Sequence, residues 1–195
     1  RKSLEYRKTI LEIIYRSGAG HTGGSLSCID ILNVLYNNIM HITPENFSSF
    51  DRDHFIQSKG HSVEALYTVL QDCGFYSQKD LNSLNQFQSH FIGHPTRKVP
   101  GVEHNTGALG HGLSVAVGMA LGLKMDKKRF RVFTLLGDVD MHVHVPNHST
   151  SGIFFRYIVA LLPRGYCRGY ARALVSSHAP SAPFNTMNKG GASVG

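Results

Sequence analysis

Apolar residues recur at helical spacing in several segments of the first 138 residues, and they form short continuous runs in two others. Helical spacing predicts amphipathic helices, whereas a short apolar run bounded by turn residues predicts a buried strand. Helices are predicted at residues 4–15, 26–40, 62–74, 77–87 and 105–124, and strands at residues 54–58 and 131–138. The alternation of strands and helices predicts an α/β fold, and the apolar run at 131–138 is typical of a central parallel strand.

Three of these helices carry further signals in their sequence. The helix at 4–15 repeats Leu4, Leu11 and Ile14/Tyr15 at helical spacing. Ser62 is placed to cap the helix at 62–74 and Gly74 to end it, while the helix at 77–87 starts with the spacing of a capping box. The helix at 105–124 has small residues at every fourth position from 110 to 122, and this stripe predicts close approach of another backbone, either within the domain or from a partner.

The pattern stops at residue 138. Residues 139–195 contain one apolar stretch, at 152–162, and are otherwise rich in Ser, Pro, Gly and Arg without a period. We therefore divide the chain into a domain at 1–138 and a divergent tail at 139–195, which reads as poorly structured. Two interpretations of the tail stay open: it is an aberrant, out-of-frame translation, or it is a genuine segment that has diverged.

Composition excludes several classes of protein. With 42% hydrophobic and 17% charged residues and no apolar run of membrane-spanning length, we expect a protein that does not enter membranes. Three cysteines without paired spacing and the absence of a signal-peptide core predict a cytoplasmic protein. The net charge is +7, but no basic cluster is interleaved with aromatic residues, so we expect no nucleic-acid partner. A mild positive field suits phosphorylated small substrates.

Histidines next to glycines are the first candidate site residues. Of the twelve histidines, His21, His61, His94 and His111 lie in glycine-rich settings. Each one alone reads as a loop or capping residue, but four together predict a polar pocket that binds phosphates and hydroxyls and moves protons. In the tail, His142, His144 and His148 form a weaker alternative, a zinc site.

Asp138 is the second candidate, because it follows an apolar strand and a glycine. In open α/β sheets ligands bind beyond the carboxyl ends of the strands, where a carboxylate can hold Mg²⁺. The alternative is an ordinary turn aspartate. Residues 107–118 contain a G-x-G, but the spacing is wrong for a dinucleotide fingerprint and no apolar strand precedes it, so a nicotinamide site is excluded.

Residues 1–138 resemble the N-terminal, thiamine-diphosphate-binding domain of transketolase. The segments that carry the resemblance are "AGHTGGSLSCIDILNVLY", "FIQSKGHSVEALYTVLQDCGF", "FIGHPTRKVPGVEHNTGALGHGLSVAVGMALGLK" and "RVFTLLGD". The resemblance implies an α/β thiamine-diphosphate-binding fold with a central, mostly parallel sheet flanked by helices, here truncated. The sequence most resembles the split bacterial and archaeal form of the enzyme, in which this half is a separate polypeptide.

The resemblance also implies an activity. Transketolases of the pentose phosphate pathway use thiamine diphosphate and Mg²⁺, or Ca²⁺, to move a two-carbon ketol unit between sugar phosphates. His21 and His94 match catalytic histidines on the substrate side, and His61 matches a histidine at the cofactor diphosphate. The other matching positions are Gly107, Leu109 and Gly137 at the cofactor and Asp138 at the metal. His111 stands where many members have glutamine and receives no firm role.

The sequence departs from the family after Asp138. Val139 replaces a glycine, no acidic helix follows, and no asparagine has the spacing of the family's second metal ligand. The family's cofactor-activating glutamate belongs to another domain, so the expected partner in an oligomer is a separate C-terminal transketolase subunit. The alternative function is a non-catalytic, truncated subunit that only assembles with partner chains.

Overall fold

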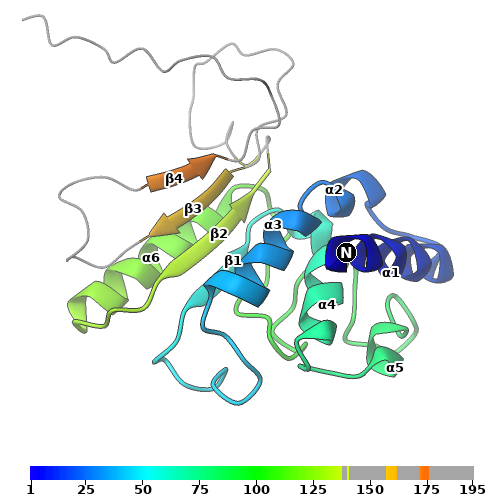
Figure 1. Cartoon of the computed structure of the whole chain (residues 1–195), viewed down its shortest axis with the longest axis horizontal. Helices are drawn as coiled ribbons and strands as arrows, with labels where there is room; N and C mark the ends of the chain where they lie inside the picture. Colours follow the sequence, from blue (N-terminus) through cyan, green and yellow to red (C-terminus); the bar gives the residue numbers. More distant parts are fainter. Residues whose placement is uncertain (138–139, 141–156, 162–171, 176–195) are drawn as a thin grey trace, which may run out of the picture.

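The computed structural model describes residues 1–137 and Asp140, together with the backbone of residues 157–161 and 172–175. The chain forms one sheet with helices on both faces (Figure 1). The prediction of an α/β fold is confirmed. Strand β1 (His54–Gln57) pairs in parallel with β2 (Val132–Leu136), with His54 opposite Val132 and Gln57 opposite Leu135. The parallel pairing predicted for the run at 131–138 is therefore also confirmed.

The sheet continues from β2 into the tail. Strand β3 (Tyr157–Leu161) pairs with β2 and β4 (Arg172–Val175) pairs with β3, both antiparallel, in the order β1-β2-β3-β4. These two strands were not predicted from the sequence, although β3 falls within the apolar stretch at 152–162. Apart from Asp140, the other residues of the tail lie outside the described residues.

Two apolar clusters cover the two faces of the β1–β2 pair, because alternate residues of a strand point to opposite faces. Phe55, Phe133 and Leu135 pack into the larger cluster, which also includes buried residues of α1 (Lys2–Ser17), α3 (Ile29–Val34) and α4 (Val63–Asp72). Ile56 and Val132 pack on the opposite face against Ala116 and Leu123 of α6 (His111–Met125). Both strands are fully buried, including the polar residues His54 and Gln57 at the ends of β1.

Short elements connect these layers. They are α2 (Thr22–Leu26), a π-helical turn η1 (Leu35–Ile39), a 3₁₀ turn η2 (Gly60–Ser62) and α5 (Gln78–Leu81). The predicted capping box is confirmed, since the Ser77 side chain accepts from the Asp80 backbone and Asp80 accepts from the Ser77 backbone. Ser62 is the N-cap of α4, but its side chain makes no capping hydrogen bond there. No helix among the described residues combines the length and the apolar content that crossing a membrane requires.

Three predicted helices differ from the structure in detail. In α1 the buried side is Tyr6, Ile10 and Ile13, whereas Leu4 and Leu11 are exposed, so the predicted repeat follows the wrong face. The helix predicted at 77–87 is only α5, because the chain turns after residue 81 and reaches a left-handed conformation at Asn85. The helix predicted at 105–124 begins at His111, because 105–110 contains two glycines at positive φ.

Candidate functional site

The carboxyl ends of β1 and β2 bring two loops together. Residues 58–62 follow β1 and lead into α4, and Gly137 follows β2. The backbone N–H of Lys59 donates to the carbonyl of Leu135 over 3.1 Å, so the first loop continues the pairing of the strands. This edge of a parallel strand pair is where ligands bind in α/β folds.

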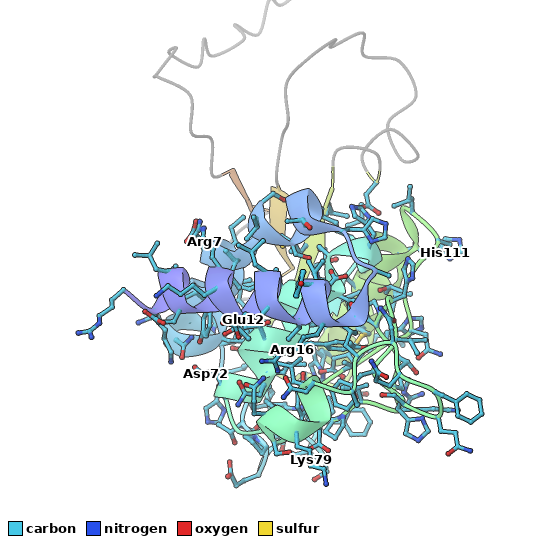
Figure 2. The ribbon with its side chains drawn as sticks, turned by 90° about the vertical axis from the view of Figure 1, so that its right-hand side faces the viewer. Arg7, Glu12, Arg16, Asp72, Lys79 and His111 are labelled. Carbon is cyan, nitrogen blue, oxygen red and sulfur yellow. The ribbon has the colours of Figure 1, made fainter. Side chains whose placement is uncertain are left out.

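Three of the four predicted histidines meet beside these loops. The ring centroids of His21 and His61 are 5.4 Å apart, and those of His21 and His94 are 6.4 Å apart, both in edge-to-face orientation. His21 and His94 are exposed and His61 is half-buried. They come from α2, η2 and the loop before α6, so the fold brings together residues that are far apart in the sequence. His111 is also exposed, and it lies at the edge of the molecule at the start of α6 (Figure 2).

Glycines allow the close packing around the histidines. A Cβ atom added at Gly24 would lie 3.1 Å from Cδ2 of His61, and one added at Gly107 would lie 3.2 Å from Cδ2 of His94. These distances are tighter than ordinary contacts. Gly24 and Gly107 therefore leave space for the rings of His61 and His94.

A buried carboxylate holds the loop that carries His21. Glu64, in the first turn of α4, is fully buried, accepts from the Ser25 hydroxyl over 2.7 Å and accepts from the His21 backbone N–H over 3.3 Å. The glycine at position 20 is needed here as well, because a Cβ atom there would lie 2.7 Å from Oε1 of Glu64 and the residue has φ 155°. Glu64 thus fixes the backbone of His21 rather than its ring.

Lys59 connects the β1 loop to α2 and adds positive charge. Its Nζ donates to the carbonyl of Gly24 over 3.0 Å and to the hydroxyl of Ser27 over 2.7 Å. Burial lowers the pKa of His61 from its usual 6.5, and the nearby Lys59 charge and His21 lower it further, against an opposing effect of Asp140. His61 is therefore neutral at pH 7, able to donate one hydrogen bond and accept another.

Asp140 is buried at the centre of the same edge. Oδ1 accepts from the Ser58 hydroxyl over 2.9 Å and from the Gly110 backbone N–H over 2.6 Å, and Oδ2 accepts from the Gly137 backbone N–H over 2.7 Å. The carboxylate thus joins the ends of both strands to the start of α6.

The structure also locates the other predicted residues. Leu109 is 37% exposed in the loop before α6, and Gly137 is buried at the end of β2. The predicted metal ligand Asp138 and the histidines at 142, 144 and 148 lie outside the described residues. Within residues 1–137 and Asp140, no three His, Cys, Asp or Glu side chains form a group that could hold a metal ion.

Sequence reasoning missed Lys59, Glu64 and Asp140. Glu64 had a usable signal, since it is a charged residue in the otherwise apolar run "SVEALYTVL". Asp140 is the last carboxylate side chain of the sequence, and nothing in the local pattern indicates which donors it meets.

One buried polar group near the site has no partner among the described residues. The Thr106 hydroxyl is buried and has no hydrogen-bond partner within the described part of the chain. It lies 3.0 Å from where a Cβ atom of Gly60 would be, so it borders both the β1 loop and the Gly107 loop.

Comparisons with known proteins agree with the family indicated by the sequence. The family model for the transketolase thiamine diphosphate binding domain matches residues 4–144. The chain is 50% identical over 137 residues to one subunit of the apulose-4-phosphate transketolase of Phocaeicola vulgatus, covering 70% of this chain and 49% of that protein. It is 41% identical over 133 residues to a 6-deoxy-6-sulfo-D-fructose transketolase subunit of a Clostridium species, covering 68% and 48%.

Solved structures support the same relationship. The transketolase of Campylobacter jejuni superimposes with a TM-score of 0.67 at 30% sequence identity, covering 72% of this chain and 23% of that chain. The chain spans about half the length of the curated subunits that it matches.

Proposed function

Because this chain belongs to the family of the transketolase thiamine-diphosphate-binding domain, we propose that it is the N-terminal subunit of a transketolase-type transferase. The complete enzyme would move a two-carbon ketol unit between sugar phosphates, as in the pentose phosphate pathway. The observation that carries the proposal is the meeting of His21, His61 and His94 next to Gly24 and Gly107 at the carboxyl edge of the strand pair.

His21 and His94 would serve the substrate. Both are exposed on the open side of the histidine group, where a sugar can reach them. Imidazoles can accept and donate protons near pH 7, so the two rings could take a proton from one sugar hydroxyl and return it to another. Glu64 would support this role by holding the backbone of His21 through its N–H.

His61 and the adjacent loops would bind the cofactor. When bound there, thiamine diphosphate would supply a nucleophilic carbon and an electron sink for the transfer. His61 can donate a hydrogen bond to a diphosphate oxygen, and the Lys59 charge nearby favours an anion. Gly107, Leu109 and Gly137 would offer close backbone approach, and Asp138 would hold Mg²⁺ or Ca²⁺ against the diphosphate.

The names of two relatives support a proposal about the substrate class. One is named as a subunit of an apulose-4-phosphate transketolase and the other as a subunit of a 6-deoxy-6-sulfo-D-fructose transketolase. We propose that this subunit serves a ketose with a phosphate group, with a sulfonate as the competing case. Comparing xylulose 5-phosphate, apulose 4-phosphate and 6-deoxy-6-sulfofructose as donors at equal concentration would rank them by kcat/KM.

A separate partner chain is the second part of the proposal. Two relatives, about half of whose length this chain covers, are each named as one subunit of their transketolase, which implies that another chain completes those enzymes. Helix α6 of this chain exposes Val117, Leu121 and Met125, and an exposed apolar helix face is typical of a protein interface.

A calorimetric titration tests the function. The full chain, co-purified with a C-terminal transketolase subunit, is titrated with thiamine diphosphate in the presence and absence of Mg²⁺. We expect saturable binding that requires Mg²⁺. The variant H61Q should weaken binding about 10- to 100-fold, because it removes an imidazole from the diphosphate side.

The matched control is H90Q, which replaces an exposed histidine outside the histidine group and should leave the affinity unchanged. Binding that survives H61Q unaltered would contradict the assignment of the diphosphate site. Stable assembly with the partner, but no cofactor binding, would favour the alternative of a non-catalytic subunit.

A further inference from the structure

Asp140 has no role in the proposed function, yet among the described residues of the site its carboxylate accepts more hydrogen bonds than that of Glu64. It is completely buried and accepts three hydrogen bonds from three different segments. Two donors are backbone amides and one is a hydroxyl. Such donors satisfy both carboxylate oxygens and so compensate the cost of burying this polar side chain.

The three segments carry the proposed cofactor contacts. Ser58 precedes the loop of His61, Gly110 ends the loop of Gly107 and Leu109, and Gly137 precedes Asp138. A single carboxylate therefore sets the distances among all three loops.

Two glycines leave the space that these hydrogen bonds require. A Cβ atom at Gly112 would lie 2.4 Å from Cβ of Ser58, so only glycine lets the first turn of α6 come close enough for Ser58 and Gly110 to reach the same oxygen. A Cβ atom at Gly137 would lie 3.2 Å from Oδ2 of Asp140, so glycine also leaves space for the carboxylate. The steric fit and the hydrogen bonds are independent observations that agree.

Lys59 links the hydrogen bonds around Asp140 to the α2 region, which carries the proposed substrate residue His21. Lys59 follows Ser58 directly, pairs through its backbone with Leu135, and donates through Nζ to Gly24 and Ser27 of the α2 region. A shift of Ser58 would thus move Lys59 and, with it, the segment that carries His21.

We propose that Asp140 is a positioning residue, whose carboxylate holds the loops of His61, Gly107 and Gly137 in the geometry that binds thiamine diphosphate; this inference rests on the proposed function. The residue acts through the loops and does not touch the cofactor. A role as the missing second metal ligand is the competing assignment, and the geometry disfavours it because both oxygens already accept from N–H or O–H groups.

The test uses D140N in the full chain with its partner subunit. The amide keeps one acceptor, but its NH₂ group must face an N–H or O–H donor, so at least one of the three bonds is lost. We expect amide exchange at Gly110 or Gly137, measured by NMR in the absence of cofactor, to become about ten-fold faster. The Kd for thiamine diphosphate at saturating Mg²⁺ should rise about 10- to 100-fold.

Two further variants keep the test decisive. S58A removes one donor and should give a smaller effect on Kd than D140N, and the two effects should be non-additive because they act on one network. D126N replaces an exposed carboxylate at the other end of α6 and should change neither readout.

The outcomes separate the assignments. Unchanged Kd in folded D140N would overturn the positioning role. Loss of Mg²⁺ dependence with unchanged amide exchange would overturn it in favour of metal ligation. If the unmodified protein binds no cofactor, the proposed function fails, and the positioning role fails with it, whatever the exchange rates show about the loops.

Discussion

At the residue scale, the protonation state of His61 depends on its burial and on the charged groups near its ring. Burial, the Lys59 charge and His21 all lower its pKa from 6.5. Because the unfolded chain then binds a proton more readily than the folded one, His61 contributes stability above about pH 6.5. That contribution is lost as the pH falls through the lower, folded pKa.

We therefore expect the His61 ring to titrate below pH 6.5 in the cofactor-free protein. Nitrogen-detected NMR of the imidazoles measures this directly. Adding thiamine diphosphate with Mg²⁺ should shift the titration upward, because the diphosphate favours the protonated ring. A His61 ring that titrates above pH 6.5 before any ligand is added would contradict the burial argument.

Glu64 is a second residue whose effect is local and large. It is fully buried, and its two oxygens accept from Ser25 and from the backbone of His21. E64A would leave two donors without a partner, and we expect the free energy of unfolding to fall by about 1 to 3 kcal/mol. Urea denaturation measures the loss.

E12A is a suitable comparison for E64A. Glu12 is an exposed residue of α1 on the face turned to the viewer in Figure 2, and its replacement should stay within about 0.5 kcal/mol. Equal losses for the two variants would mean that the bonds of Glu64 contribute no more than an average surface contact.

At the element scale, α6 combines two kinds of glycine. Gly112 is pressed against Ser58, whereas a Cβ atom at Gly118 or Gly122 would meet no atom within 4 Å among the described residues. Glycine in a helix interior costs about 0.5 to 1 kcal/mol relative to alanine. Glycine at 118 or 122 therefore destabilises the helix in the isolated chain, and no neighbouring atom among the described residues requires a glycine there.

We expect G118A to stabilise the isolated chain by about 0.5 to 1 kcal/mol and G112A to destabilise it. If the exposed side of α6 packs against the partner subunit, G118A should also weaken that assembly. Thermal denaturation measures the first effect, and sedimentation velocity of the mixed subunits measures the second. Destabilisation by G118A in the isolated chain would show that the position is already filled.

The element scale also shows how far the sequence could predict this fold. The two strands were predictable because fully buried strands have continuous apolar runs, and the capping box of α5 because Ser77 and Asp80 are local in sequence. The buried face of α1 was not, because Leu4 and Tyr6 are both apolar and only packing against other helices, among them α3 and α4, selects between them. The start of α6 depended on Gly110, whose amide is held by a residue 30 positions away.

The residues of the candidate site also divide into those that the sequence could predict and those that it could not. His21, His61 and His94 were predictable because glycine beside histidine is a local pattern, and the structure brings them together. Lys59 and Asp140 were not, because their significance comes from donors and acceptors supplied by other elements. The functional roles of these residues stay predictions.

At the scale of the whole molecule, networks of hydrogen bonds hold both ends of the β1–β2 strand pair. The carboxyl edge carries the candidate site. At the other edge Arg131, just before β2, donates to both oxygens of Asp53 and to the carbonyl of Ile39 at the end of η1. Burial alone would raise the pKa of Asp53, but the bonds from Arg131 and from the His41 backbone outweigh it and lower the pKa.

The pKa of Glu103 is lowered in the same way as that of Asp53. Burial would raise its pKa, and the bonds from His54 and Arg52 lower it. Carboxyl groups with a lowered folded pKa stabilise the protein above their unfolded pKa, and this contribution is lost as the pH falls through the folded value. Asp53, Glu103 and His61 therefore all make the protein less stable in acid.

We expect the melting temperature to fall steadily from pH 7 to pH 3. R131Q should lower the free energy of unfolding at pH 7 by roughly 2 to 4 kcal/mol, somewhat less than for a fully buried pair because Arg131 is partly exposed. The loss of stability caused by R131Q should become smaller as Asp53 becomes protonated in acid. Calorimetric melts across this pH range measure both effects.

K128Q breaks the exposed pair with Asp51 in the same region and should change stability by less than about 1 kcal/mol. A loss from R131Q that stays constant down to pH 3 would show that the pairing with Asp53 is not its source.

The close contact between Gly112 and Ser58 has a consequence for how freely this sequence can vary. Any side chain at 112 would displace the end of β1 and the donors gathered there, whereas positions 118 and 122 of the same helix have open space beside them. In a library of random substitutions selected for activity, position 112 should return only glycine. Position 118 should accept alanine and serine whenever no partner chain covers it, so tolerance along one helix would map where a neighbouring subunit begins.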